Sequence, residues 1–347
     1  MRFHPFSTGV KAALMAALLF GAATPLAKLI LASVSPWLLA GLFYLGSGLG
    51  LAIYRKLAKA PAVSLPRQER YWLAGAILAG GIVAPVLLMT GLTAMPASGA
   101  SLLLNAEGVF TALLAWFAFK ENVDRRIALG MLAIVLGAAI LGWPGTAEFA
   151  TPWPALAILG ACLAWAVDNN LTRKVSLNDA SWLASVKGLF SGGTNLLLAW
   201  LAGATLPSPG IALGAMLLGF LAYGVSLALF VVALRHLGTA RTGAYFSIAP
   251  FFGTLLALVL GEPLTAPLVV AGLLMALGIW LHISEHHEHA HVHDEIEHEH
   301  EHVHDQHHQH AHDVDVIPTV PHRHLHRHSR IEHTHAHFPD AHHRHTH

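Results

Sequence analysis

Charged side chains are scarce over most of this chain of 347 residues. Asp, Glu, Lys and Arg make up 12% of it, whereas an average soluble domain carries about 25%. Hydrophobic residues make up 54% and the mean hydropathy is +0.54. Apolar runs of roughly 20 residues recur between Val10 and Ile283, each long enough to cross a ~30 Å hydrocarbon core. The scarcity of charge therefore excludes an ordinary soluble fold and predicts a polytopic membrane protein.

Cysteine is nearly absent, and so are the motifs of enzymes and pumps. The single Cys162 excludes a disulfide within the chain and a cysteine metal site. The sequence holds no phosphate-cradling Gly loop, no nucleophile–His–acid set and no HExxH helix. We therefore expect neither an enzyme nor an ATP-driven pump, and we expect no nucleic-acid partner.

The composition changes abruptly after Ile283. Residues 284–347 hold 24 of the 27 histidines and 12 of the 20 acids. This segment has too few apolar residues to fold by itself, so we predict a disordered tail.

Dense His-x-His alternation in the tail predicts divalent metal binding. Neutral imidazole suits Zn, Ni and Cu, and neighbouring acids add oxygen ligands. The second part of the tail mixes His with Arg and should bind metal less well. The expected ligands are therefore in the first part: His286, His287, His289, His291, His293, His298, His300, His302, His304, His307, His308, His310 and His312. Beyond such a metal on the tail, no cofactor is required.

The apolar region predicts ten transmembrane helices. Short loops that mostly contain Pro or Gly separate the apolar runs. The expected spans are 10–31, 36–54, 72–94, 97–119, 126–143, 153–172, 182–202, 211–234, 241–260 and 266–283.

Lys and Arg fall on one side only of this predicted topology. If the amino terminus is inside, every inner segment carries them, as with Arg55 and Lys56 or Arg125 and Arg126, and the outer loops carry none. The positive-inside rule then places both termini in the cytoplasm. Lys28 and Lys187 lie within spans.

The stretch from Pro96 to Glu121 returns, altered, from Gly238 to Glu262. Both copies run through an F-x-T-L-L-A-like segment and stop at a glutamate, at offsets of 142 and then 141 residues. Each half has five predicted spans, so the second half enters from the opposite side. This predicts two inverted five-helix repeats, at 1–145 and 146–283, followed by the tail at 284–347. Transporters of this plan bind substrate near the bilayer midplane, at the repeat interface.

This pattern resembles the EamA-type transporters of the drug/metabolite transporter superfamily. The resemblance covers residues 10–283 and is carried by the doubled plan, the entry Pro96–Ala100, the segment Ala106–Thr111 and the ending Gly261–Leu264. It implies an inner-membrane carrier that exports small organic solutes, often with proton coupling. The family often has Glu-Pro where this chain has Glu107-Gly108, and the second half has Ala249-Pro250.

Two acids within the spans are the main candidates for substrate or ion coupling. Glu107 lies about ten residues into its span, near the midplane, where a carboxyl can exchange a proton or simply join helices by hydrogen bonds. Asp168 shares a helical face with Trp165, Asn169 and Thr172, or is a helix-end charge paired with Arg173 or Lys174.

Lys28, near the outer end of span one, either snorkels to the interface or serves as a cation for Glu107 or an anionic substrate. Further candidates are polar side chains expected to form hydrogen bonds in a cavity: Thr24, Asn105, Asn195 and Tyr245.

Two functions remain open at this point. One is a secondary-active exporter of a small solute by alternating access, with a regulatory metal-binding tail. The other is a divalent Ni, Co or Zn exporter whose tail loads or senses the metal. The expected partners are a small-molecule substrate, the lipid bilayer and divalent metal ions, and the expected state is a monomer or homodimer.

Overall fold

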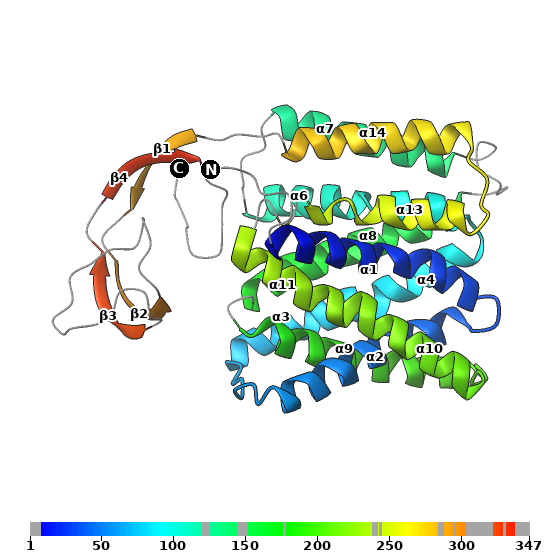
Figure 1. Cartoon of the computed structure of the whole chain (residues 1–347), viewed down its shortest axis with the longest axis horizontal. Helices are drawn as coiled ribbons and strands as arrows, with labels where there is room; N and C mark the ends of the chain where they lie inside the picture. The colour runs from blue at the N-terminus through cyan, green and yellow to red at the C-terminus, as the bar shows by residue number, and fades with distance from the viewer. Residues whose placement is uncertain are drawn as a thin grey trace. The chain divides into compact units, whose positions relative to one another are not determined.

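The computed structural model describes residues 8–119, 125–143, 152–175, 178–237, 242 and 245–283, and four strands between 288 and 336. The chain divides into two units, Met1–Glu285 and His286–His347. In the first unit, long helices lie side by side, nearly along one direction (Figure 1).

The first half of the helical unit contains α1 to α7. The bounds are α1 Thr8–Ile30, α2 Pro36–Leu57, α3 Arg67–Ala76, the π-helix η1 Ile77–Val83, α4 Ala84–Thr93, α5 Ala97–Leu103, α6 Ala106–Phe119 and α7 Arg125–Gly142. Because α3, η1 and α4 follow one another without a gap, they form one continuous rod.

The second half contains α8 to α14. The bounds are α8 Trp153–Thr172, the short 3₁₀ turn η2 Arg173–Val175, α9 Ala180–Leu201, α10 Pro209–Gly219, the π-helix η3 Phe220–Val225, α11 Ser226–Leu237, α13 Ala249–Val259 and α14 Ala266–Ile283.

Six of the described helices are long and apolar enough to cross a membrane: Thr8–Ile30, Pro36–Leu57, Arg67–Thr93, Ala97–Leu114, Trp153–Thr172 and Pro209–Ala233. Shorter apolar helices cover Ala128–Gly142, Ala249–Val259 and Ala266–Leu281. Large apolar side chains such as Trp200 and Val259 are more than 70% exposed on the outside of the bundle. The predicted polytopic, helical membrane fold is therefore confirmed, and the count of ten spans stays a prediction.

The predicted span 97–119 is a helical stretch that is interrupted inside and consists of α5 and α6. It breaks at Leu104 and Asn105, where the backbone N–H of Asn105 donates to the Leu102 carbonyl at 3.0 Å. The side-chain Nδ2 of Asn105 donates to the same carbonyl at 3.0 Å. An Asn side chain that competes for backbone groups in this way favours a turn over a helix. Glu107 consequently lies in the first turn of a new helix, α6.

The second half has a similar break. Ser247 and Ile248 form a turn before α13, and Pro250 lies in the first turn of that helix. Proline is tolerated there because the N–H it lacks would have no partner inside the helix. Within the predicted span 241–260, residues 242, 245 and 246 are helical and α13 follows the turn, and residues 241, 243 and 244 lie outside the described residues.

The rod of α3, η1 and α4 changes its winding at η1 because of Pro85. Proline has no N–H and its ring crowds the carbonyl four residues earlier, which is that of Gly81. In a π-helix the N–H of residue 85 would donate to the carbonyl five residues earlier, which is that of Gly80, and Pro85 has no N–H to donate. The carbonyls of Gly80 and Gly81 thus become available to donors from other helices.

Close contacts between small residues join helices of the two halves. Helices α2 and α9 meet at Gly48 and Gly188, and a Cβ on Gly188 would lie 2.6 Å from the Gly48 Cα. Helix α14 approaches α7 in the same manner, with Gly278 against the Gly130 carbonyl. In a membrane, such small residues let helix backbones approach closely and pack well.

The second unit contains four strands, where the sequence predicted no regular structure. Strand β1 (Glu288–His293) pairs antiparallel with β4 (Ile331–Ala336), and β2 (Ile296–His302) pairs with β3 (His322–His328). Alternation with a period of two is the pattern of a strand, so His-x-His permits the pairing. The register sets histidines opposite one another, as in His291 with His333 and His300 with His324.

Of the predicted metal ligands, six lie on these strands, and nothing is described of their side chains: His289, His291, His293, His298, His300 and His302. The others lie outside the described residues: His286, His287, His304, His307, His308, His310 and His312.

Candidate functional site

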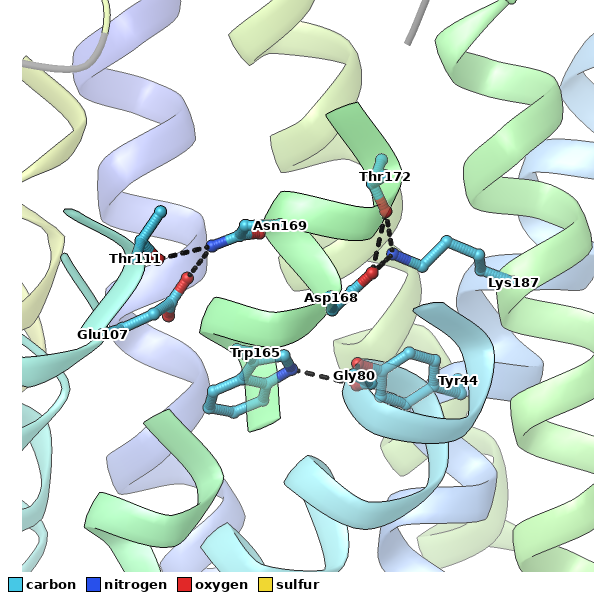
Figure 2. Close-up of polar contacts among 9 residues, drawn as sticks. All are labelled: Tyr44, Gly80, Glu107, Thr111, Trp165, Asp168, Asn169, Thr172 and Lys187. Carbon is cyan, nitrogen blue, oxygen red and sulfur yellow. Dashed lines mark hydrogen bonds and ion pairs between the residues drawn. The ribbon is translucent and has the colours of Figure 1, made fainter. Parts of the chain in front are cut away.

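Glu107 is joined to the opposite half of the bundle by neutral donors. Nδ2 of Asn169, on α8, donates to Oε1 of Glu107 at 2.8 Å and lies 3.3 Å from the Thr111 hydroxyl. Figure 2 shows these three side chains converging between α6 and α8.

Asp168, which directly precedes Asn169 on α8, has a cationic partner. Nζ of Lys187, on α9, lies 2.6 and 2.7 Å from the two oxygens of Asp168. The Thr172 hydroxyl donates to Oδ1 of Asp168 at 2.8 Å. Asp168 is 6% exposed, so this carboxylate is both buried and charge-compensated.

The Gly80 carbonyl of η1 receives two side-chain donors. The Tyr44 hydroxyl donates to it at 2.7 Å and the Trp165 indole N–H at 3.0 Å. Both rings flank Gly80 in Figure 2. A Cβ at Gly80 would collide with the Asp168 carboxylate, so only glycine admits Asp168 here. Asn195 donates to the adjacent Gly81 carbonyl at 2.9 Å.

Aromatic rings continue the site toward α1. Tyr44 stacks on Tyr223 of η3 with ring centroids 5.4 Å apart. Tyr223 in turn meets Phe20 of α1 at 5.8 Å, and Phe20 meets Phe246 at 5.4 Å. Polar side chains and aromatic rings from both halves therefore meet around η1 and α8.

The side chains on the predicted polar face of α8 contact three neighbouring elements. Trp165, Asp168 and Thr172 make their hydrogen bonds toward η1 and α9, whereas Asn169 bonds to α6. One alternative for Asp168 was a helix-end charge paired with Arg173 or Lys174, and the structure shows an ion pair with Lys187. A helix of 3.6 residues per turn separates adjacent residues by 100°, which accounts for the division.

Lys28 lies at another place in the bundle. Its Nζ donates to the carbonyls of Leu92, Thr93 and Met95 at 2.6, 3.2 and 3.1 Å. These carbonyls are at the carboxyl end of α4, where a cation is favourable to the helix dipole.

The remaining candidates have local roles in packing or hydrogen bonding. Asn105 bonds within its turn and lies 3.7 Å from the Met275 sulfur. Thr24 is 4% exposed on α1, and Tyr245 packs against Ala12, Ala13 and Ala233.

Several residues of this site were not among the predicted candidates, and they include Lys187, Tyr44, Gly80 and Thr111. Lys187 had a sequence signal, because a lone charge within an apolar span marks a buried partner or a function. Gly80 had only the indirect signal of Pro85 five residues later. Among the described residues no group of three or more His, Cys, Asp or Glu side chains could hold a metal ion.

Comparison with known proteins gives three findings. The profile of the EamA-like transporter family matches the chain twice, at residues 7–143 and 152–284. An uncharacterized transporter of Methanothermobacter thermautotrophicus is 27% identical over 290 residues, which are 77% of this chain and 83% of that protein. A solved crystal structure matches with a TM-score of 0.59 at 20% identity, over 78% of this chain and 95% of the other. At that identity the last likeness shows the fold alone.

Proposed function

This chain belongs to the EamA-like transporter family, and we propose that it is a secondary-active carrier that exports a small solute by alternating access. The family and the apolar helices make it a multi-pass membrane protein. The proposed location is the inner membrane, with both termini in the cytoplasm, because Lys and Arg gather on one side of the predicted topology. A membrane domain of two inverted repeats would alternate its opening around a central site.

Several observations support the inverted repeat. The family profile matches each half separately. Each half has a π-helix at a corresponding place, η1 and η3, and a helix break at a corresponding place, before α6 and before α13. The sequence copies align at an offset of 142 residues, and the residues 106 and 249 that begin these two helices differ by nearly that number.

The observation that carries the proposed coupling role is the contrast between the two acids. Lys187 neutralises Asp168. Glu107 instead accepts a hydrogen bond from the neutral side chain of Asn169. A carboxyl within a membrane span that is held by a neutral donor suits a group that takes up and releases a proton. We therefore assign the exchangeable proton to Glu107 and a fixed charge to Asp168.

The test is Glu107→Gln, which keeps the shape and one acceptor of Glu107 and removes its titration. A tolerance screen of a deletion strain first identifies a transported solute, and flux is then measured in proteoliposomes. We expect the variant to lose transport driven by a pH gradient while it retains part of the solute exchange without a gradient. A matched control is Glu69→Gln, since Glu69 accepts a hydrogen bond from Asn178 outside this site. Wild-type pH dependence in Glu107→Gln would refute the proton role.

For the tail we propose divalent metal binding that regulates the carrier. This rests on its composition and on the alternation of histidine along the strands, which sets His opposite His. Imidazole is a good ligand for Zn, Ni and Co. If the transported solute proves to be one of these metals, the tail becomes a loader, and the carrier becomes a metal exporter.

A further inference from the structure

Glu262 joins the two halves of the bundle at one end. It lies just after α13, and its two carboxylate oxygens accept the backbone N–H groups of Ala97 and Ser98 at 2.7 and 2.8 Å. These two N–H groups belong to the first turn of α5, where the helix itself offers no acceptor. A carboxylate is the favoured partner for such groups because it also complements the helix dipole.

Lys28 also holds the short connection between α4 and α5, on the α4 side. It caps α4 through the carbonyls of Leu92, Thr93 and Met95, directly before the α5 turn that Glu262 holds. Glu262 lies within electrostatic range of Lys28. One charge from each half thus holds the connection between α4 and α5, and of these two charges Glu262 makes the contact between halves.

The seam beneath this contact is closed. The Thr254 hydroxyl of α13 donates to the Ser98 carbonyl at 3.1 Å. One turn further along α5, Ser101 is 1% exposed, and a Cβ on Gly253 would come within 2.6 Å of its hydroxyl oxygen. Movement of α13 away from α5 would therefore break the two bonds to Glu262 before it could expose Ser101.

We propose that Glu262 is the latch of the gate at this end of the carrier, and that the gate opens by separation of α13 from α5. This rests on the proposed alternating access. The Lys and Arg pattern assigns this end to the outside, so the state described here is closed outward. Glu121, at the corresponding place in the first half, lies outside the described residues, and the proposal concerns Glu262 alone.

Glu262→Gln tests the latch, because an amide can accept only one of the two bonds and presents its own N–H groups to the other donor. The reporter is Ser101→Cys in a Cys162→Ser background, labelled with a membrane-impermeant maleimide added from outside. Loss of a helix-capping acceptor should raise the labelling rate roughly tenfold. Thr254→Cys is the second reporter, on the opposite wall of the seam.

Two controls separate a latch from general loosening. Glu69→Gln removes a carboxylate whose bond is to Asn178, and it should leave the labelling of Ser101→Cys unchanged. Cys162 is buried against the Leu103 carbonyl, and it should stay unlabelled in Glu262→Gln that is otherwise wild type. An unchanged rate at both reporters, or an equal rise at Cys162, would overturn the latch. Absence of solute flux in the wild-type protein would instead refute the carrier function, and labelling does not depend on that flux.

Discussion

Replacement of Lys187 by Met should be among the most destabilising single changes in the bundle. It leaves Asp168, which is 6% exposed, with a hydrogen bond from the Thr172 hydroxyl in place of a cation. Met fills most of the lysine volume, so the loss is electrostatic rather than one of packing. Two charge-assisted hydrogen bonds, at 2.6 and 2.7 Å, disappear at about 1.5–3 kcal/mol each. That sum agrees with the cost of about 3–5 kcal/mol for removing one partner of a buried ion pair.

The decisive measurement is a double-mutant cycle. Asp168→Leu with Lys187→Met removes both charges together, and such apolar replacement of a buried pair is often nearly neutral. We expect each single variant to melt roughly 10 °C below wild type, and the double variant to regain most of that difference. Thermal unfolding of purified protein in detergent measures both. The exposed Lys56 provides the control, since Lys56→Met should change the stability by less than about 0.5 kcal/mol.

A double variant no more stable than either single variant would refute the buried pair. The cycle also bears on the proposed division of roles. If the double variant folds and retains transport that depends on pH, Asp168 carries no exchangeable proton. If the double variant folds but loses that dependence, the proton cannot be assigned to Glu107 alone.

Three further predictions concern the ends of the bundle and the tail. Burial raises the pKa of Asp179, yet hydrogen bonds from Ser181, the Trp182 N–H and Arg55 bring it below its usual 3.8. Because the folded pKa is the lower one, this stabilisation is present above about pH 4 and lost as the pH falls through the folded value; Asp179→Ala should cost about 1 kcal/mol at pH 7 and flatten the acid side of a stability–pH curve. A reporter fused after His347 should act as cytoplasmic and one inserted at Gly145 as external; the opposite result at either place would remove the inverted-repeat argument. Truncation after Ser284 should abolish most Ni or Zn binding in calorimetry and leave the melting temperature of the bundle unchanged; metal binding that survives truncation would place the ligands among the helices.

The sequence alone determined the class of the fold and the positions of most helices. These features follow from local signals: the apolar runs, the Pro and Gly residues in the loops, and the Lys and Arg residues on one side. Each signal can be recognised without knowing which residues are in contact in the fold. The position of Glu107 within its span was equally plain, since a charge in an apolar run is conspicuous at any position. The break before Glu107 was not predicted, because it depends on how the Asn105 side chain competes for a backbone carbonyl.

Only the tertiary structure decided which side chains meet. The sequence offered Arg173 or Lys174 nearby as partners for Asp168, and the fold brings Lys187 of α9 to it. The sequence allowed Lys28 to be the cation that binds an anionic substrate, yet its ammonium contacts carbonyls at the end of α4. Glu262 ended a repeated motif without apparent partners, and the fold brings it to α5, 164 and 165 residues away in the chain. Periodicity specifies the face on which a side chain lies, whereas the partner on that face depends on the packing of helices distant in sequence.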